Sequence, residues 1–425
     1  MIGARQKKFS DCVSLLSGGT PAKSNPQFWG GQIPWVSCKD MKVDRIAGSQ
    51  DYLTEDGAAK IRMVPERTIL LVVRGMILAK ALPVALTNLP VTFNQDLKAL
   101  ICKEGIDTTF LYYWLKGNEH QILGIVDEAG HGTKRIQTDR LMNLNVTVPE
   151  LPTQRRIASI LSAYDDLIEN NNKRIKILEE MARMLYREWF VHFRFPGHEK
   201  VKMVDSALGK IPEGWRAGTL FDLPISFIDG DRGKNYPKKA DFLERGFCLF
   251  LNTGNIKQDR FDFSTTAFIT EERDNLLRKG KLSSGDTILT TRGTVGSVAY
   301  YSDIPAYKYV RINSGMLIVR TDDHLNAPLF FYHLFKSQEM KENYTQFATG
   351  SAQPQLPIKT LEKIPIIIPA EHLMTLFNEQ IYPTNRMIEL LQLKNMNLQE
   401  SRDLLLPKLI SGELDVDELD IEGAA

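Results

Sequence analysis

Two stretches of the chain repeat apolar residues at alternating intervals of four and three. Such a heptad pattern is typical of a helix that packs against a partner helix along its whole length. In the first stretch, which runs from Leu151 to Phe190, Asn171 completes a seam whose other members are Ile157, Leu161, Tyr164, Ile168, Ile175, Leu178, Ala182, Leu185 and Trp189. Pro152 suits the first turn of a helix, and Pro196-Gly197 suits its end. About forty residues predict a helix on the order of 55–60 Å long.

The second seam lies near the other end of the sequence. Its members are Phe377, Ile381, Thr384, Ile388, Leu391, Asn395, Leu398, Arg402, Leu405 and Leu409. Pro383 predicts a kink or a delayed start of this helix. Each seam contains an asparagine, which in coiled coils fixes the register at some cost in stability. We therefore expect the two helices to pair with each other; two independent core helices are the alternative.

An internal repeat divides the chain into halves. VRG at 73–75 matches TRG at 291–293, an offset of 292 − 74 = 218. HGTKRIQ at 131–137 matches TGSAQPQ at 349–355 (350 − 132 = 218), and FLYYWL at 110–115 matches LFFYHL at 329–334 (332 − 113 = 219). A period near 218 is too long for a solenoid repeat, so it predicts a duplicated unit of one domain and one long helix.

Composition is that of a globular protein, with 43% hydrophobic and 25% charged residues. The four cysteines show no metal or redox spacing and favour a reducing cytoplasm, and no apolar run predicts a signal peptide or a membrane span. Six of the last thirteen residues are acidic, so the net charge of +1 becomes +1 − (−6) = +7 without them. The acidic end is expected to be a disordered, solubilising tail, with a partner-binding segment as the alternative.

Enzyme motifs are absent from the sequence. It contains no G-x-x-x-x-G-K-[ST], no G-x-G-x-x-G after a strand, no H-E-x-x-H, no G-x-S-x-G and no paired C-x-x-C. Neither a bound cofactor nor a metal is expected, and nothing in the pattern indicates catalysis.

Several loops instead carry residues suited to nucleic acid. Lys and Arg neutralise phosphates, and Arg, Asn and Gln can pair with base edges in the major groove. The candidate DNA-binding residues are Lys23, Lys39, Arg74, Lys80, Asn94, Gln95, Lys134, Arg135, Arg232, Lys234, Asn235, Tyr236, Lys238, Asn252, Asn255, Lys257, Arg292, Arg311, Gln353 and Gln355. Arg74 and Arg292 are the strongest, because both follow a buried strand at equivalent positions of the repeat. The alternatives are a solvated surface charge for any single Lys, a turn or strand-end hydrogen bond for Asn94 and Gln95, and a structural salt bridge for the two arginines. Trp215 is expected to anchor the core of the second domain.

Several segments in family order make the chain resemble the specificity subunit of type I restriction-modification systems. They are GGTPAKSNPQFWGGQIPWVSCKDM, VPELPTQRRIASILSAYDDLIENNNKRI, IPEGW, DGDRGKNYP, LNTGNI, GSAQPQLPIKTLEKIPIIIP and LLLPKLISGEL, which span nearly the whole sequence. One departure is AEHLMTLFNEQIYP, which replaces the glutamine-arginine start of the first long helix. The two docking surfaces for methylation subunits therefore need not be alike.

The resemblance implies an α+β fold: two globular mixed α/β target recognition domains separated by two long antiparallel coiled-coil helices, with a pseudo-two-fold internal repeat. The expected segments are recognition domain 1 (1–150), the central helix (151–195), the linker with recognition domain 2 (196–370), the C-terminal helix (371–412) and the acidic tail (413–425).

The resemblance also implies a function. The chain would be a non-catalytic subunit that reads a split, asymmetric site in double-stranded DNA, one half-site per domain. Its helices would set the spacer and dock two methylation subunits, to which restriction subunits add. A coiled-coil scaffold without DNA specificity and an enzyme with an unrecognised site are the alternatives.

Overall fold

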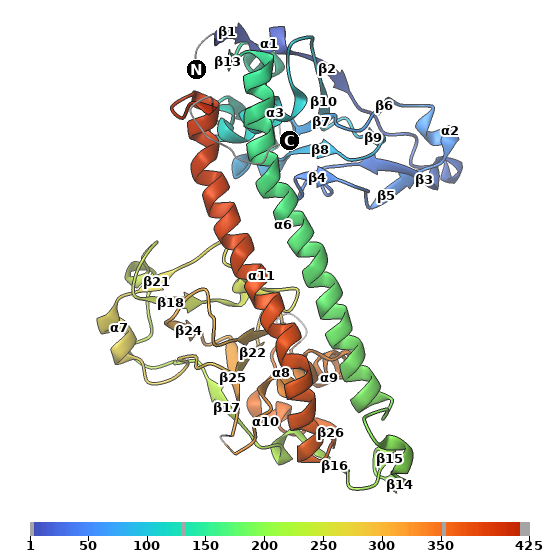
Figure 1. Cartoon of the computed structure of the whole chain (residues 1–425), viewed down its shortest axis with the longest axis vertical. Helices are drawn as coiled ribbons and strands as arrows, with labels where there is room; N and C mark the ends of the chain where they lie inside the picture. The colour runs from blue at the N-terminus through green and yellow to red at the C-terminus, as the bar shows by residue number, and fades with distance from the viewer. Residues whose placement is uncertain (1–3, 129–131, 323, 351–353, 417–425) are drawn as a thin grey trace. The chain divides into compact units, whose positions relative to one another are not determined.

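The computed structural model describes residues 4–128, 132–322, 324–350 and 354–416. The chain divides into two compact units, which we call unit 1 (residues 1–169 and 395–425) and unit 2 (residues 170–394). The long helices α6 (Leu151–Tyr186) and α11 (Glu371–Ser411) each contribute one part to each unit. Figure 1 shows α6 in green and α11 in red. Each unit therefore combines a globular domain with a segment of both helices.

Unit 1 is built on two sheets. The five-stranded sheet has the order β2 (Val13–Ser17), β10 (Leu97–Cys102), β7 (Ile69–Val72), β8 (Val84–Thr87) and β4 (Arg45–Ile46). The four-stranded sheet has the order β5 (Asp51–Leu53), β3 (Trp29–Val36), β9 (Val91–Phe93) and β6 (Met63–Val64). Two further pairs are β1 (Arg5–Lys8) with β13 (Asn145–Val148), and β11 (Val126–Glu128) with β12 (Lys134–Ile136). All four residues of β7 are buried, as its continuous apolar run predicts for a central strand.

Short helices complete unit 1, and α3 supplies much of its core. They are α1 (Phe9–Cys12), α2 (Glu55–Ala58), α3 (Thr108–Gly117), α4 (Glu119–Leu123) and α5 (Thr138–Met142). The Asp107 carboxylate caps α3 by accepting from the Phe110 N–H at 2.9 Å. The buried residues of α3 join one cluster with Leu161 of α6 and Leu409 of α11. The ends of both long helices are thus part of this domain's core.

Unit 2 repeats the arrangement. Its main sheet has the order β17 (Ile225–Asp229), β25 (Met316–Thr321), β22 (Asp286–Thr290) and β23 (Val298–Tyr301). A second sheet has the order β21 (Phe268–Ile269), β18 (Cys248–Leu251) and β24 (Val310–Ile312), with β18 parallel to β24 as β3 is to β9. The remaining strand pairs are β14 (Met203–Ser206) with β15 (Gly209–Pro212), β16 (Arg216–Thr219) with β26 (Pro365–Ile368), and β19 (Ile256–Lys257) with β20 (Arg260–Phe261). Its short helices are α7 (Glu271–Leu276), α8 (Pro328–Lys336), α9 (Gln338–Phe347) and α10 (Ile358–Leu361).

These matching orders confirm the duplication, with one refinement of its register. The Ile136 N–H donates to the Val73 carbonyl at 2.9 Å, and the Leu356 N–H donates to the Thr291 carbonyl at 3.0 Å. Ile136 and Leu356 are therefore equivalent, and their offset is 356 − 136 = 220. The strands that follow, β13 and β26, keep that offset (365 − 145 = 220). From Arg135 and Gln355 onwards, the offset is therefore two residues larger than in the ungapped alignment of HGTKRIQ with TGSAQPQ.

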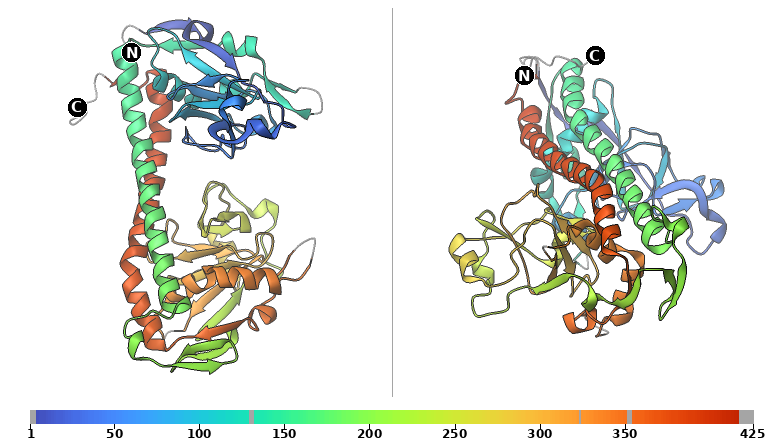
Figure 2. Two further views of the ribbon diagram at one scale, coloured as in Figure 1. Left: turned by 90° about the vertical axis from the view of Figure 1, so that its right-hand side faces the viewer. Right: turned by 60° about the horizontal axis from the view of Figure 1, so that its bottom comes forward.

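The long helices pair antiparallel within each unit. In unit 2, Ile175 of α6 forms a buried cluster with Ile388 and Leu391 of α11, and the partly buried Leu178 packs against it. Figure 2 shows the two helices running side by side in both views. The seam asparagines, Asn171 and Asn395, are both buried. In the described part of the chain, no helix combines the length and apolarity that a membrane crossing requires.

The ends of the helices differ in detail from the sequence-based expectation. α11 is not delayed by Pro383; this residue is exposed, so water can hydrate the carbonyl that loses its N–H partner. α6 ends at Tyr186 and passes into a π-helical turn at Arg187–Val191, short of residue 195. Phe193 then adopts a left-handed conformation with φ of 58°. Trp189 and Phe190 are buried in the core of unit 2, and that packing fixes the turn.

The two segments expected to be a linker and a tail are partly structured. The linker contains the β14–β15 hairpin, and Trp215 beyond it is buried and stacked on Phe195 with ring centroids 5.3 Å apart. Trp215 is thus confirmed as a core anchor. Leu414 and Val416 pack on the core of unit 1, and Val416 is 1% exposed. The expectation of a disordered end is therefore wrong for these residues, and residues 417–425 lie outside the described part of the chain.

Candidate nucleic-acid interface

Three connections and one strand meet in unit 1 and form what we call loop cluster 1: residues 37–40, 74–80, 94–96 and 134–136. The Cys38 thiol lies 3.7 Å from the Arg74 carbonyl oxygen, to which it donates. The Gly75 N–H donates to the Lys134 carbonyl at 2.9 Å, and Arg74 forms an antiparallel bridge with Arg135. Because β3 and β9 run parallel, the connections that follow them leave the same sheet edge. The fold thus gathers cationic residues that are far apart in sequence.

The cations of loop cluster 1 differ in how strongly the protein holds them. The side chains of Lys39, Arg74, Lys80 and Arg135 are exposed. Within the described residues, the Arg74 guanidinium makes no hydrogen bond or ion pair. Lys134 is half-buried and pairs with Glu128 at 3.0 Å. Gly75, at φ 150° and ψ 158°, adopts a conformation essentially restricted to glycine, which fixes the turn that presents Arg74.

The corresponding loop cluster 2 in unit 2 consists of residues 252–255, 291–295, 313–315 and 355–356. The Arg292 N–H donates to the Gly315 carbonyl at 3.2 Å. The backbone of Arg292 forms an antiparallel β-bridge with that of Gln355, as the backbone of Arg74 does with that of Arg135. The Thr294 hydroxyl donates to the Thr253 carbonyl at 3.5 Å. Arg292 is exposed and, within the described residues, its side chain makes no polar contact. The equivalence of Arg74 and Arg292 in the sequence is therefore an equivalence in the fold.

A pocket of about 290 Å³ opens beside Arg292. Its lining includes Arg232, Arg292, Gln355 and Lys359, three cations and one amide, together with Asp229. Arg232 pairs with Asp229 at 3.0 Å and donates to the Ser314 carbonyl at 3.3 Å, so this guanidinium is held in place. Arg292 and Gln355 have the donor and acceptor groups that pair with guanine and adenine edges. The arrangement can bind an anion and a base edge together.

Three sequence-predicted residues are used inside the fold instead. Arg311 is 5% exposed and pairs with the buried Asp274, while its other nitrogens donate to backbone carbonyls. Asn255, at 1% exposed, donates to the Asp262 and Thr265 carbonyls at 3.0 and 2.7 Å. Asn94 is buried and donates to the Asp96 carboxylate at 3.2 Å. These side chains are not available to DNA in this structure, so we leave them out of the interface.

The remaining predicted residues fall into two groups. Lys23, Lys234 and Lys238 are exposed on loops. The others make local contacts: Gln95 accepts from Thr20 (2.6 Å), Asn235 donates to the Leu276 carbonyl (3.2 Å), Tyr236 packs on Phe250, Asn252 accepts from the Gly254 N–H (2.8 Å), and Lys257 pairs with Asp262 (2.5 Å). Gln353 lies outside the described residues.

The structure also places residues that the sequence analysis missed. Lys359 lines the unit 2 pocket, and its position four residues after Gln355, the last residue of the GSAQPQ segment, was the available signal. Met76 and Ile77 lie in loop cluster 1 and are exposed although apolar. The signal for these two was an apolar pair directly after the Arg74-Gly75 turn.

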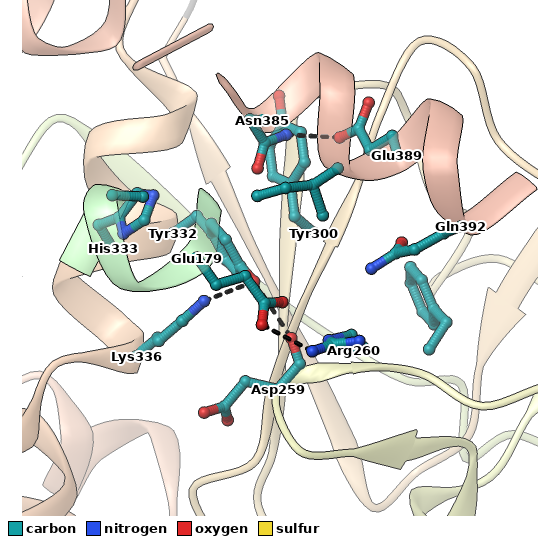
Figure 3. A pocket seen from close by; sticks show the side chains of 13 residues that line it. Glu179, Asp259, Arg260, Tyr300, Tyr332, His333, Lys336, Asn385, Glu389 and Gln392 are labelled. Carbon is teal, nitrogen blue, oxygen red and sulfur yellow. Dashed lines mark hydrogen bonds and ion pairs between the residues drawn. The ribbon is translucent and has the colours of Figure 1, made fainter. Parts of the chain in front are cut away.

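A second pocket in unit 2 lies where the domain meets the long helices (Figure 3). The Glu179 carboxylate pairs with Arg260 at 2.6 Å, and the Lys336 ammonium donates to the Tyr332 hydroxyl at 3.2 Å. Its volume of about 40 Å³ suits a water molecule or two, and is too small for a nucleotide or a methyl donor. This pocket is a polar junction between helices and domain.

Glu389 of α11 also lines this junction. Burial and the nearby Asp303 raise its pKa to about 7, against the opposing effect of hydrogen bonds from Ser302 and Asn385. The Asn385 amide donates to the Glu389 carboxylate at 2.5 Å. Burial also lowers the pKa of His333 to about 3, so this imidazole is neutral near pH 7. Among the described residues, no group of three or more His, Cys, Asp or Glu side chains could hold a metal ion.

Comparisons with known proteins agree with the duplicated fold. The family model described as the type I restriction modification DNA specificity domain matches residues 3–180 and 212–383. The chain is 28% identical, over 97% of its length and 94% of the relative, to the type I restriction enzyme MjaIX specificity subunit of Methanocaldococcus jannaschii. It is 34% identical to the Escherichia coli EcoR124I/EcoR124II specificity subunit, over 46% of this chain and 49% of that one.

A solved structure shows the same fold. The crystal structure of the type I restriction-modification system S subunit from M. genitalium superposes with a TM-score of 0.59 at 17% identity and covers 96% of both chains. The family match covers well over half of the sequence, and its two segments coincide with the two halves of the repeat. The chain therefore belongs to the type I restriction-modification DNA specificity family.

Proposed function

We propose that this protein is the DNA-reading subunit of a type I restriction-modification complex and that each unit reads one half of a split, asymmetric site. The observation that carries the proposal is the exposed arginine at the same turn of both units, Arg74 and Arg292, each beside further polar loops. The relatives named as specificity subunits support the same function. Because the side chains of the two loop clusters differ, the half-sites should differ.

The two long helices would set the distance between the half-sites. α6 is helical over 36 residues, which at 1.5 Å per residue gives about 54 Å. A helix paired along a seam is stiff, and half-site spacing in such readers is a geometric property of the protein. The spacer of the DNA site is therefore proposed to depend on helix length and not on the loop clusters.

A docking surface for a methylation subunit is proposed on the helix segments of unit 2. Apart from Tyr382, the large apolar residues exposed there are Ile177, Met181 and Met184 of α6 and Leu376, Met387 and Leu390 of α11, between 38% and 60% exposed. Every one of them directly precedes a seam residue. In two antiparallel helices, positions with the same relation to the seam lie on the same side of the pair. They form one apolar face across both helices, of the kind that packs against partner helices.

The corresponding face of unit 1 is more polar. At the offset of 220, the residues equivalent to Ile177, Met181 and Met184 are Asn397, Ser401 and Leu404. The residues equivalent to Leu376 and Met387 are Arg156 and Leu167. We therefore propose two unequal docking surfaces for two methylation subunits, with restriction subunits added to that assembly. The methyl donor and the catalytic residues are assigned to the partner chains, and this chain is proposed to be non-catalytic.

A methylation map tests the half-site proposal. We expect a host strain to lose methylation at one split, asymmetric motif when the gene is deleted, and to regain it when the gene is restored. An unchanged map together with no co-purifying methyltransferase would overturn the proposal. The scaffold alternative predicts no sequence preference and no salt dependence, whereas DNA readers lose affinity steeply as salt rises.

The docking surface has its own test. Replacing Ile177, Met181 and Met184 together with serine should reduce co-purification of the methylation subunit at least tenfold, because each removes exposed apolar area from the proposed contact. Met203, Val204 and Leu208 on the β14–β15 hairpin are also exposed and provide a matched triple-serine control. Equal loss in both variants would place the docking site elsewhere.

A further inference from the structure

Loop cluster 1 displays two apolar side chains that the core does not use. Met76 is 64% exposed and Ile77 43% exposed, at the start of the short 3-10 helix Met76–Ala79. Leu78, the next residue, is buried and ties this turn to the domain core. The exposure of Met76 is therefore a property of an anchored turn.

The equivalent turn of unit 2 lacks this feature. At the offset of 218, Met76 and Ile77 correspond to Thr294 and Val295. Thr294 is polar and donates to the Thr253 carbonyl, and Val295 packs against the core of unit 2. The Arg-Gly turn is common to both units, but only unit 1 follows it with an exposed large apolar side chain.

The surroundings of Met76 favour DNA as the molecule that covers it. Lys39, Arg74, Lys80 and Arg135 in the same loop cluster are all exposed. An apolar protein partner or a lipid tail would have to desolvate these charges, whereas a nucleic acid pairs them with phosphates. The apolar feature that B-DNA offers in the major groove is the 5-methyl group of thymine.

We propose that Met76 is a specificity-determining residue that contacts the 5-methyl group of a thymine in the half-site read by unit 1. The inference rests on the proposed function. Arg74, the exposed arginine that carries the proposed function, is separated from Met76 only by Gly75, so DNA that contacts Arg74 also lies close to Met76. Unit 2 has the shorter, polar Thr294 at this position, so its turn reaches less far.

The test uses the purified complex of this chain with its methylation subunits and a random double-stranded DNA library. We expect the wild-type complex to select a split motif with a T·A pair in the half-site of unit 1. The Met76→Ala variant should lose the preference at that position and leave the other half-site unchanged. Met63→Ala, another exposed methionine of unit 1 (55%), is the matched control and should select the wild-type motif.

A second arm isolates the methyl group. Replacing the selected thymine with uracil removes only that group and should weaken wild-type binding about fourfold, the value of one buried carbon. The same replacement should leave binding by Met76→Ala unchanged. Tolerance of uracil by the wild type, or an unchanged motif for Met76→Ala, would overturn this inference. Failure of the wild-type complex to select any split motif would instead overturn the proposed function.

Discussion

The two units attach to the long helices through different chemistry at equivalent positions. In unit 1, Asp165 of α6 accepts from Arg402 at 2.5 Å and from the Tyr113 hydroxyl at 2.6 Å. At the offset of 220 its counterpart in unit 2 is Asn385, which donates to Glu389 at 2.5 Å. One junction is ionic, and the other is an amide beside a carboxyl group with a raised pKa. A duplicated backbone can therefore be retained while the polar contacts that hold it diverge.

Replacing Asp165 with asparagine would give unit 1 the residue that unit 2 has at the equivalent position. Of the substitutions that compare the two junctions, it has the largest expected effect on stability. The side chains of Asp165 and Arg402 are 8% and 13% exposed, so the substitution removes the most buried charge partner of this guanidinium and leaves the more exposed Asp44 and Asp403. We expect a loss of about 2 kcal/mol in the free energy of unfolding, measured by denaturant titration.

Asp403 offers the control for this prediction. It also pairs with Arg402, at 2.8 Å, but its side chain is 61% exposed. Asp403→Asn should change the free energy of unfolding by less than about 0.5 kcal/mol. Similar losses in both variants would show that burial does not distinguish the two pairs.

The arginines of the two loop clusters allow the contribution of each unit to DNA recognition to be tested separately. Arg74→Ala should weaken discrimination in one half-site by about 10–100-fold and leave the other intact, and Arg292→Ala should do the reverse. The measurement is competition binding with each half-site altered in turn. Lys23→Ala, an exposed loop cation, should reduce affinity for all sequences alike. Loss of both half-sites from one substitution would contradict independent reading by the two units.

The raised pKa of Glu389 predicts a pH dependence confined to unit 2. Its pKa rises from an ordinary 4.5 to about 7 on folding, so the folded state favours the protonated carboxyl group. The contribution of the protonated Glu389 to the free energy of unfolding is fully present below pH 4.5, and it is lost as the pH rises through 7. Glu389→Gln should remove about 1–2 kcal/mol of the fall in stability between pH 5 and pH 8, since partial exposure reduces the full effect.

Glu180 provides the comparison for that titration. It is an exposed helix carboxylate paired with Arg183, which lowers the pKa of Glu180. Glu180→Gln should therefore leave the pH dependence above pH 5 as in the wild type. A wild-type pH profile in Glu389→Gln would show that another group titrates in this range.

The smallest expected difference concerns the ion pairs that join each domain to α6. Arg45 pairs with Asp166 in unit 1, and Arg260 pairs with Glu179 in unit 2, both at 2.6 Å. The two acids are 58% and 21% exposed. Arg45→Ala should cost about 0.5 kcal/mol of unfolding free energy and Arg260→Ala about 1 kcal/mol. The reverse order in thermal unfolding would contradict a dependence on burial.

The repeating patterns made the architecture predictable. The heptad seams predicted both long helices, and the two halves of the repeat correspond to two domains whose shared strands have the same order. Local pattern could not show which polar side chains form hydrogen bonds or ion pairs inside the protein. Arg311 and Asn255 are residue types that often contact DNA, but Arg311 pairs with Asp274 and Asn255 donates to two backbone carbonyls. Nor could local pattern show that Met76 stays exposed, because the burial of an apolar residue depends on packing between distant segments.

The place of the chain's last helix has a consequence for synthesis. Unit 2 is a continuous segment, residues 170–394, whereas the core of unit 1 also includes side chains from residues 395–416. Leu406, Leu409 and Val416 belong to the core cluster that contains the first domain's α3. A ribosome therefore releases every residue of unit 2 before it completes the core of unit 1. The unit whose first residues are translated first must wait for residues 395–416 before its core is complete. A chain that stops before residue 395 would retain all of unit 2 and lack part of the core of unit 1.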